Sequence, residues 1–183
     1  MMQQRMRALH RAGTQQIVRL AALVALHAMP ATHASAPITV SGHDAATVIA
    51  RVQVLVNQAR ARPRRCGREH FPGTQPLAQS STLQQAAAGH AMQMARFNFF
   101  DHAGRDGSQP RDRIARLGYA SRLTGENIAY GPESAEEVVA GWLASPGHCA
   151  NIMDGRFRTM GIAFAIEPRR HAIVWVQDLA WPR

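Results

Sequence analysis

The feature that most constrains the fold is a change of periodicity along the chain, from helical spacing to strand-like segments at the end. Residues 160–167 and 171–179 are rich in β-branched and aromatic side chains, and only Pro168-Arg169-Arg170 separates them. Two such runs on either side of a short turn predict an antiparallel hairpin. A chain with helices first and its clearest strands last is expected to pack helices on an antiparallel sheet, which is an α+β fold.

Apolar residues recur at helical spacing in the segments before this hairpin. Residues 43–62 have one apolar face, and Pro63 ends the predicted helix. A second helix is expected over 81–97, where His90 lies on the apolar face and is interpreted as a buried core histidine, with a role as a fourth site ligand as the alternative. The inward stripe of this helix comprises Leu83, Ala87, His90, Met94 and Phe97.

Shorter elements are expected between the second helix and the hairpin. Helices are predicted over 109–117 and 135–144, and the second of them begins with the capping-box pattern Ser134-Ala135-Glu136-Glu137. Residues 126–130 are expected to be extended. Three prolines and two glycines make 63–80 a long irregular connection.

The first 34 residues have the pattern of a secretory signal peptide. Four arginines and no acidic residue precede a short apolar run at 20–26, and small residues follow it up to Ala34. The run is shorter than the roughly 20 residues that a membrane-spanning helix needs. We expect cleavage after Ala34, a flexible segment over 35–47, one domain over 48–183 and no membrane span in the mature chain. A disordered basic arm or an uncleaved anchor is the alternative.

Cys66 and Cys149 are the two cysteines of the chain. An even count in an exported protein favours a disulfide, and a reactive thiol or a metal-ligating cysteine is the alternative. Closing a loop of about 80 residues stabilises a fold by roughly 4–5 kcal/mol in the chain-entropy model. The bond would tie the neighbour of His148 to the loop that follows the first helix.

One dense basic cluster follows the first predicted helix. It is interpreted as a solvated helix end and loop, with binding to an acidic envelope polymer or to nucleic acid as the alternative. The chain has no nucleic-acid-binding motif and no aromatic residues interleaved with the cluster, so no nucleic-acid partner is expected. The cluster comprises Arg60, Arg62, Arg64, Arg65 and Arg68.

Three side chains that lie close in sequence to glycine or proline residues are the candidate site residues. They are His102, Glu126 and His148. Histidine and glutamate bind divalent metals or transfer protons near neutral pH. Two imidazoles and one carboxylate leave a tetrahedral ion one open position for water, as in catalytic zinc sites. Without a metal, Glu126 could instead bridge the two imidazoles in a hydrogen-bonded network.

Catalysis has weaker support in the sequence than binding. The chain lacks a His-Glu-x-x-His motif, and Asp101 and Glu137 are candidate general bases only by their proximity in sequence. A serine hydrolase is disfavoured because Ser145 precedes a proline and no Gly-x-Ser-x-Gly motif is present.

The order of the motifs closely resembles the CAP superfamily of cysteine-rich secretory, antigen 5 and pathogenesis-related proteins, above all its bacterial secreted branch. The resemblance covers about residues 48–183. The matching motifs are Phe100-Asp101-His102, Asp106-Gly107-Ser108, Arg113-Ile114, Gly118-Tyr119, Gly125-Glu126-Asn127-Ile128-Ala129, Gly141-Trp142 and Ser145-Pro146-Gly147-His148-Cys149-Ala150-Asn151-Ile152-Met153.

The resemblance implies an α-β-α sandwich with a central antiparallel sheet flanked by helices. It also implies a surface cleft lined by two histidines and two acidic residues, which holds zinc or another divalent ion in some members. His102, Glu126 and His148 match three of these four positions. Ser145 stands at the fourth, where eukaryotic members have a glutamate, and Ser145 and Asn127 are expected to line the cleft.

The function implied is that of a secreted or periplasmic protein whose His/Glu/His cleft binds a ligand or a weakly held divalent metal without catalysis. The ligand would be a lipid, a glycan or a protein of the cell envelope. One alternative is a metal-dependent hydrolase of peptide or peptidoglycan, with His102, Glu126 and His148 as its catalytic residues. Another is a structural or defence factor of the envelope.

Overall fold

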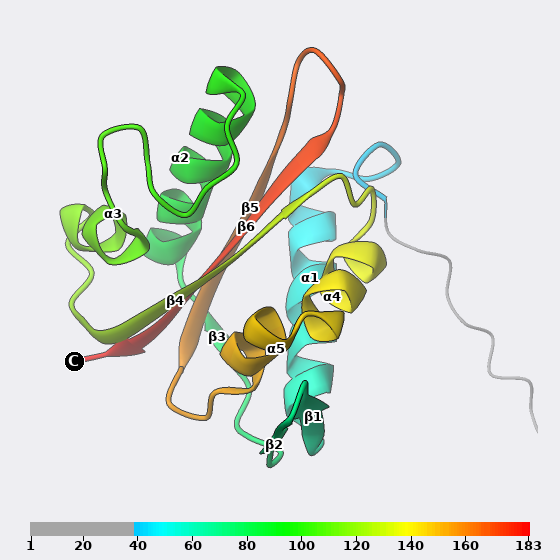
Figure 1. Ribbon diagram of the computed structural model, residues 1–183, viewed down its shortest axis with the longest axis vertical. Coiled ribbons are helices and arrows are strands. Elements are labelled where there is room, and N and C mark those ends of the chain that lie inside the picture. The colour runs from blue at the N-terminus through cyan, green and yellow to red at the C-terminus, as the bar shows by residue number, and fades with distance from the viewer. Residues whose placement is uncertain (1–38) are drawn as a thin grey trace, which may run out of the picture. The chain divides into compact units, whose positions relative to one another are not determined.

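A four-stranded sheet divides residues 39–183, the part of the chain that the structure describes, into three layers (Figure 1). In this computed structural model, α2 and α3 cover one face of the sheet, and α1, α4 and α5 cover the other. This confirms the predicted α+β sandwich. The helices are α1 Ala45–Arg60, α2 Ser81–Phe97, α3 Pro110–Arg116, α4 Ala135–Ala144 and α5 Pro146–Met153, and the strands are β1 Arg64–Cys66, β2 Glu69–Phe71, β3 Ala78–Gln79, β4 Ser121–Tyr130, β5 Thr159–Ile166 and β6 Ile173–Pro182.

The order of strands in the sheet is β3-β5-β6-β4. β6 pairs antiparallel with β5 in the predicted hairpin and with β4 on its other side, whereas the two-residue β3 pairs parallel with β5. β4 is twice as long as the predicted 126–130, because its first half also pairs with the end of β6. This pairing makes β4 an edge strand, open to loops from both helical layers.

β6 is central and buried on both faces, which explains its nearly continuous run of apolar residues. Its odd-numbered apolar residues pack toward α1, α4 and α5, and its even-numbered ones pack toward α2 and α3. Gln177 and Asp178 are the polar exceptions, and both are fully buried. The first set is Ile173, Trp175 and Leu179, and the second is Val174, Val176 and Ala180.

The N-terminal predictions are corrected in part. The predicted signal peptide, 1–34, lies outside the described residues. Within the predicted flexible segment, Thr39 forms a β-bridge with Ser134, and α1 already begins at Ala45 with Asp44 as its N-cap. The structured domain therefore begins before residue 48.

The connection after α1 is more ordered than its prolines and glycines predict. β1 and β2 form a small antiparallel hairpin that turns through Gly67, whose φ is +60°. The interpretation of Arg60 as part of a solvated cluster is wrong. Its buried guanidinium donates to the carbonyl oxygens of Ile152 at 2.6 Å and Asp154 at 3.0 Å, and burial lowers its pKa to about 10.

The inward stripe of α2 is confirmed except at its last residue. Leu83, Ala87, His90 and Met94 are buried, whereas Phe97 is 45% exposed. The Arg105 guanidinium lies 4.1 Å from the centroid of the Phe97 ring. α2 ends at Phe97, and Asn98 caps the helix with a left-handed φ of 53°.

Gly161 in β5 is required by the packing of α2 on the sheet. A Cβ built there would lie 2.0 Å from the Gln84 nitrogen and 2.1 Å from the Leu83 carbonyl carbon, both backbone atoms of the first turn of α2. Because neither helix nor strand backbone can move without disturbing the core, only glycine permits this approach.

We expect Gly161→Ala to destabilise the fold by about 3 kcal/mol, the upper end of the usual cost of overpacking, because the methyl group meets backbone atoms. Urea unfolding followed by tryptophan fluorescence measures the change. The matched control is Gly141→Ala in α4, where a Cβ meets nothing within 4 Å. That change should stabilise the helix by about 0.5–1 kcal/mol. Equal stability of the two variants would contradict the packing argument.

Cys66 and Cys149 form a disulfide, as predicted, with their Cα atoms 5.5 Å apart. The bond joins β1 to the first turn of α5 and closes a loop with a sequence separation of 83. It therefore fixes the helix that carries His148 to the hairpin after α1.

Replacing both cysteines with alanine should lower the free energy of unfolding by about 2–5 kcal/mol, because the unfolded chain regains the freedom of the open loop. Denaturant titration of the wild type and the double variant measures this loss. Alkylation of the unreduced wild type, followed by intact mass measurement, is the companion test. Two alkylated thiols in that sample would contradict the bond.

Candidate functional site

The candidate site lies where the two helical layers meet across the edge strand. β4 supplies Glu126, the loop between α2 and α3 supplies His102, and α5 supplies His148 (Figure 1). Because β4 has no neighbour on its outer side in the sheet, loops from both layers can approach it. The topology thus explains how residues far apart in sequence reach one region.

Glu126 is the buried centre of this site, with a side chain that is 1% exposed. Its Oε1 accepts a hydrogen bond from His102 Nδ1 at 2.7 Å, and its Oε2 accepts one from Arg113 Nη2 at 2.6 Å. Charge-assisted hydrogen bonds of this kind offset the cost of burying a carboxylate. Both oxygens of Glu126 are therefore engaged, one by each partner.

Arg113 also holds the loop that carries His102. The buried guanidinium donates through Nη1 to the carbonyl oxygens of His102 and Ser108, both at 2.9 Å. Arg113 therefore fixes the backbone of His102, while Glu126 fixes its ring. Arg113 was not predicted to be a site residue from the sequence, although the Arg113-Ile114 motif was a signal for it.

The same contacts set the charge of His102. Its hydrogen bond with Glu126 raises the pKa of the imidazole above the ordinary value, and the negative charges of Glu126 and Asp101 add to the effect against partial burial. The His102 side chain is 47% exposed. Because Nδ1 is committed to Glu126, Nε2 is the ring nitrogen that remains for a ligand.

His90 lies beneath this pair, on the buried face of α2. Its Nε2 is 2.8 Å from the Asp101 carbonyl oxygen and 4.0 Å from Glu126 Oε1. Complete burial lowers the pKa of His90, which keeps the imidazole neutral, with Nε2–H donating to the carbonyl. The interpretation of His90 as a hydrogen-bonded core histidine is confirmed.

Asp178 is a second buried carboxyl group beside Glu126. The two residues are directly paired across β4 and β6, and Asp178 is completely buried. Within residues 39–183, neither Asp178 oxygen has a donor. Burial and then the charge of Glu126 raise the pKa of Asp178 well above its usual range, so the protonated group can share its hydrogen with Glu126. The feature of the sequence that could have identified Asp178 is its position as an acidic residue within an otherwise mostly apolar strand.

Asn127 supports the site from the opposite face of the sheet. Its buried amide donates to Gln177 Oε1 at 2.9 Å and to the His148 carbonyl oxygen at 3.2 Å. The prediction that Asn127 lines the cleft is therefore wrong, because the side chain is buried between β4 and α5. Its role is to hold α5 against the sheet, helped by Asn151, which donates to Asn127 Oδ1 at 2.9 Å.

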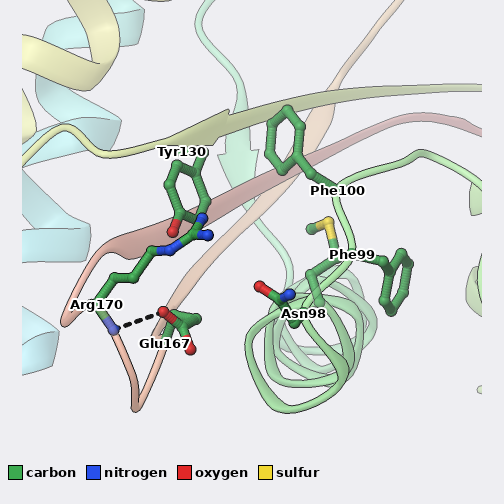
Figure 2. Close-up of a pocket in the computed structure, with 7 residues that line it drawn as sticks. Asn98, Phe99, Phe100, Tyr130, Glu167 and Arg170 are labelled. Atoms are coloured by element: carbon green, nitrogen blue, oxygen red, sulfur yellow. Dashed lines mark hydrogen bonds between the residues drawn. The ribbon is translucent and has the colours of Figure 1, made fainter.

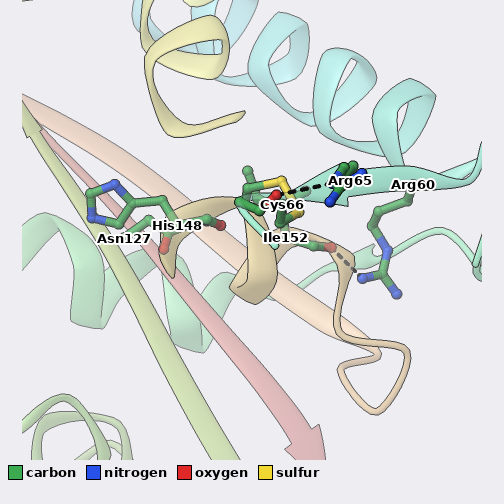
Figure 3. The surroundings of a disulfide bond; sticks show 8 residues. Arg60, Arg65, Cys66, Asn127, His148 and Ile152 are labelled. Atoms are coloured by element: carbon green, nitrogen blue, oxygen red, sulfur yellow. Dashed lines mark hydrogen bonds between the residues drawn. A yellow bond between two sulfur atoms is a disulfide. The ribbon is translucent and has the colours of Figure 1, made fainter. Parts of the chain in front are cut away.

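His148 is half-buried near the start of α5, and Figure 3 shows its ring pointing away from the disulfide. Burial, followed by the charge of His102, lowers the pKa of His148. The pKa values of the two imidazoles are therefore shifted in opposite directions, because His102 has a carboxylate partner and His148 does not. Glu126 does not bridge these two histidines; it joins His102 to Arg113.

A cleft of 520 Å³ opens beside His102. Ser145 and His148 are not part of its lining; Ser145 is half-buried between α4 and α5, where its backbone N–H ends α4. Arg111 and His102 are the basic residues of the lining, and Glu126 is the acidic one. The lining comprises His102, Gln109, Pro110, Arg111, Thr124, Gly125 and Glu126.

As three direct metal ligands, the predicted set does not fit this arrangement. Across residues 39–183, no three histidine, cysteine or acidic side chains are grouped so that they could hold an ion. Both Glu126 oxygens already bind protein donors. Glu126 fits instead the role of the carboxylate that orients a ligating histidine through its other nitrogen.

Comparisons with known proteins agree with this architecture. The pattern that defines the cysteine-rich secretory protein family matches residues 55–179. An uncharacterized protein of Bacillus subtilis, YkwD, is 30% identical over 147 residues, which are 80% of this chain and 50% of YkwD. This chain therefore spans about half the length of that relative.

Solved structures show the same fold. An extracellular protein with an SCP domain from Bacillus anthracis aligns with a TM-score of 0.63 at 24% identity, over 80% of this chain and 45% of that one. A cysteine-rich secretory protein from Staphylococcus aureus aligns with a TM-score of 0.57 at 15% identity, over 76% and 40%. Within residues 39–183, no helix has the length and apolar character to cross a membrane.

In a pH titration followed by NMR, we expect the imidazole of His102 to titrate above 6.5 and that of His148 below it. The raised pKa means that the His102–Glu126 pair stabilises the fold fully below pH 6.5, and that this contribution is lost as pH rises through the folded-state pKa. Glu126→Gln should bring the His102 pKa down. A wild-type His102 that titrates below His148 would contradict a hydrogen bond between His102 and the Glu126 carboxylate.

Proposed function

Because the chain belongs to the cysteine-rich secretory protein family, we propose that it is an exported binding protein whose cleft beside His102 takes a ligand of the cell envelope. The apparent signal peptide and the extracellular relative from Bacillus anthracis support export. The ligand class is a lipid, a glycan or a protein of the envelope. The conclusion rests chiefly on the arrangement of Glu126, Arg113 and His102.

This arrangement suits binding because it presents a fixed imidazole at a cleft rich in donors. Glu126 and Arg113 immobilise His102 before a ligand arrives, which lowers the entropic cost of binding. The charge of Glu126 is matched by Arg113, so His102 and Arg111 leave the cleft suited to an anionic or oxygen-rich group.

A divalent ion is part of the proposal, held weakly by the two imidazoles through His102 Nε2 and the ring of His148. Glu126 would orient His102 without coordinating the ion. A bound ion would supply an electrophile for an oxygen of the ligand. Since a protonated imidazole cannot coordinate a metal, affinity should rise with pH through the raised pKa of His102.

Hydrolysis is less well supported by the same geometry. A general base needs a carboxylate oxygen that can accept a proton at the cleft. Glu126 is the acidic residue of the lining, and both of its oxygens are engaged. Glu137 accepts the backbone N–H of Glu133 at the start of α4, and Asp101 accepts that of Ala103, so both carboxylates have local structural roles.

Calorimetric titration of residues 35–183 with Zn²⁺ tests the metal part of the proposal. The wild type should bind weakly, and His102→Ala and His148→Ala should abolish the heat of binding. Glu126→Gln should weaken it by about 10–100-fold, as expected for a group that orients a ligand. The control is His70→Ala in β2, which should bind as the wild type does.

Equal heats for the wild type, His102→Ala and His148→Ala would contradict metal binding by this pair. Abolition of binding by Glu126→Gln, in a protein with unchanged stability, would instead make Glu126 a direct ligand.

A further inference from the structure

A second pocket, with a volume of 350 Å³, lies between the end of α2, the end of β4 and the β5–β6 turn (Figure 2). It shares no lining residue with the cleft beside His102. Its size is near the lower end of the range of about 300–1,000 Å³ for ligand pockets, which suits one ring-sized group. The lining comprises Met94, Asn98, Phe99, Phe100, Tyr130, Glu167 and Arg170.

Two aromatic rings are exposed at this pocket. Phe100 is 49% exposed and Tyr130 is 41% exposed, and their ring centroids lie 6.0 Å apart in an edge-to-face arrangement. Adjacent exposed aromatic side chains on an ordered surface indicate a binding site rather than a packing need. Aromatic rings present a flat, electron-rich face to the C–H groups of a sugar or to another ring.

Polar groups of three kinds surround these rings. Across residues 39–183, the Asn98 amide, the Tyr130 hydroxyl and the Arg170 guanidinium have no side-chain or backbone hydrogen-bond partner. Figure 2 shows Arg170 and Tyr130 on one side of the pocket, with Phe100 and Asn98 on the other. The pocket thus combines an apolar wall with an amide, a hydroxyl and the positive charge of Arg170, which lies beside the Glu167 carboxylate.

The backbone holds two of these groups in place. Asn98 ends α2 in the left-handed conformation, with its N–H bonded to the Met94 carbonyl oxygen. Glu167 is buried and accepts the N–H groups of Arg169 at 2.9 Å and Arg170 at 2.8 Å. The carboxylate of Glu167 is therefore used to shape the turn that carries Arg170.

We propose that this pocket binds a sugar ring that carries a carboxylate. The aromatic rings contact the C–H face of the sugar, Asn98 and the Tyr130 hydroxyl bond to its hydroxyl or amide groups, and Arg170 binds the carboxylate through its planar fork. An aromatic acid would also match the rings and Arg170, but it would leave Asn98 and the Tyr130 hydroxyl without partners. This site goes beyond the function proposed for the cleft and does not depend on it.

The test uses two sugars that differ by one carboxyl-bearing group, N-acetylmuramic acid and N-acetylglucosamine. Each is titrated into isotope-labelled residues 35–183 and followed by NMR. N-acetylmuramic acid should give saturable shifts at Asn98, Tyr130 and Arg170, with an affinity roughly tenfold above that of N-acetylglucosamine, since a charge-assisted pair is added.

Arg170→Ala should abolish the preference for the acidic sugar, and Phe100→Ala should weaken both sugars. The matched control is Arg169→Ala on the same turn, whose side chain does not line the pocket. It should retain the wild-type preference.

Any of the following results would overturn the proposal: no saturable shift with either sugar at millimolar concentration, an unchanged preference in Arg170→Ala, or shifts centred on His102 instead of this pocket. Tighter binding of benzoate than of N-acetylmuramic acid would also overturn it, in favour of an aromatic acid. Arg170 does not line the cleft beside His102. Failure of the sugar experiment would therefore leave the cleft proposal unaffected, and failure of the metal experiment would leave the sugar proposal unaffected.

Discussion

The interaction on which the rest of the site depends is the burial of one carboxylate. Glu126 lies on an edge strand under a loop, where burying its charge would destabilise the fold unless hydrogen-bond donors surround the carboxylate. Arg113 and His102 provide those donors, and Arg113 in turn holds the loop by its carbonyl oxygens. Removing the carboxylate would therefore release the ring of His102 and leave Nη2 of the buried Arg113 guanidinium without its acceptor.

The sheet carries polar groups on both of its faces at this one position. Glu126 and Asp178 face the layer of α2, and the neighbouring pair Asn127 and Gln177 faces the layer of α5. Two successive residue pairs of β4 and β6 therefore point to opposite faces of the sheet, and each pair contacts one of the two helical layers. A slip of one residue would exchange the acidic pair with the amide pair and destroy both supports.

The elements with a clear hydrophobic period could be predicted from the sequence, because the spacing of their apolar residues shows which face of each element is buried. The hairpin of β5 and β6, helix α2 and the pattern around Trp142 are of this kind. Glu126 and His102 could be identified from the sequence motifs around them, whereas the hydrogen bond between them is seen only in the folded structure. Arg113, Asp178 and Arg60 could not be assigned from spacing, because their partners come from other layers or from backbone carbonyls.

The anchoring of α5 depends on an oxidation, because one of its bonds to the rest of the fold is the disulfide between Cys66 and Cys149. Cys149 is the neighbour of His148, so the covalent bond to Cys66 secures α5, which is also held by the Asn127 amide, by the Arg60 guanidinium and by core packing. Thiols oxidise readily only outside the reducing interior of the cell. In the proposed exported protein, the bond would form after synthesis, when an oxidant takes the electrons of the two thiols, and a reduced copy would carry His148 on a less firmly anchored helix.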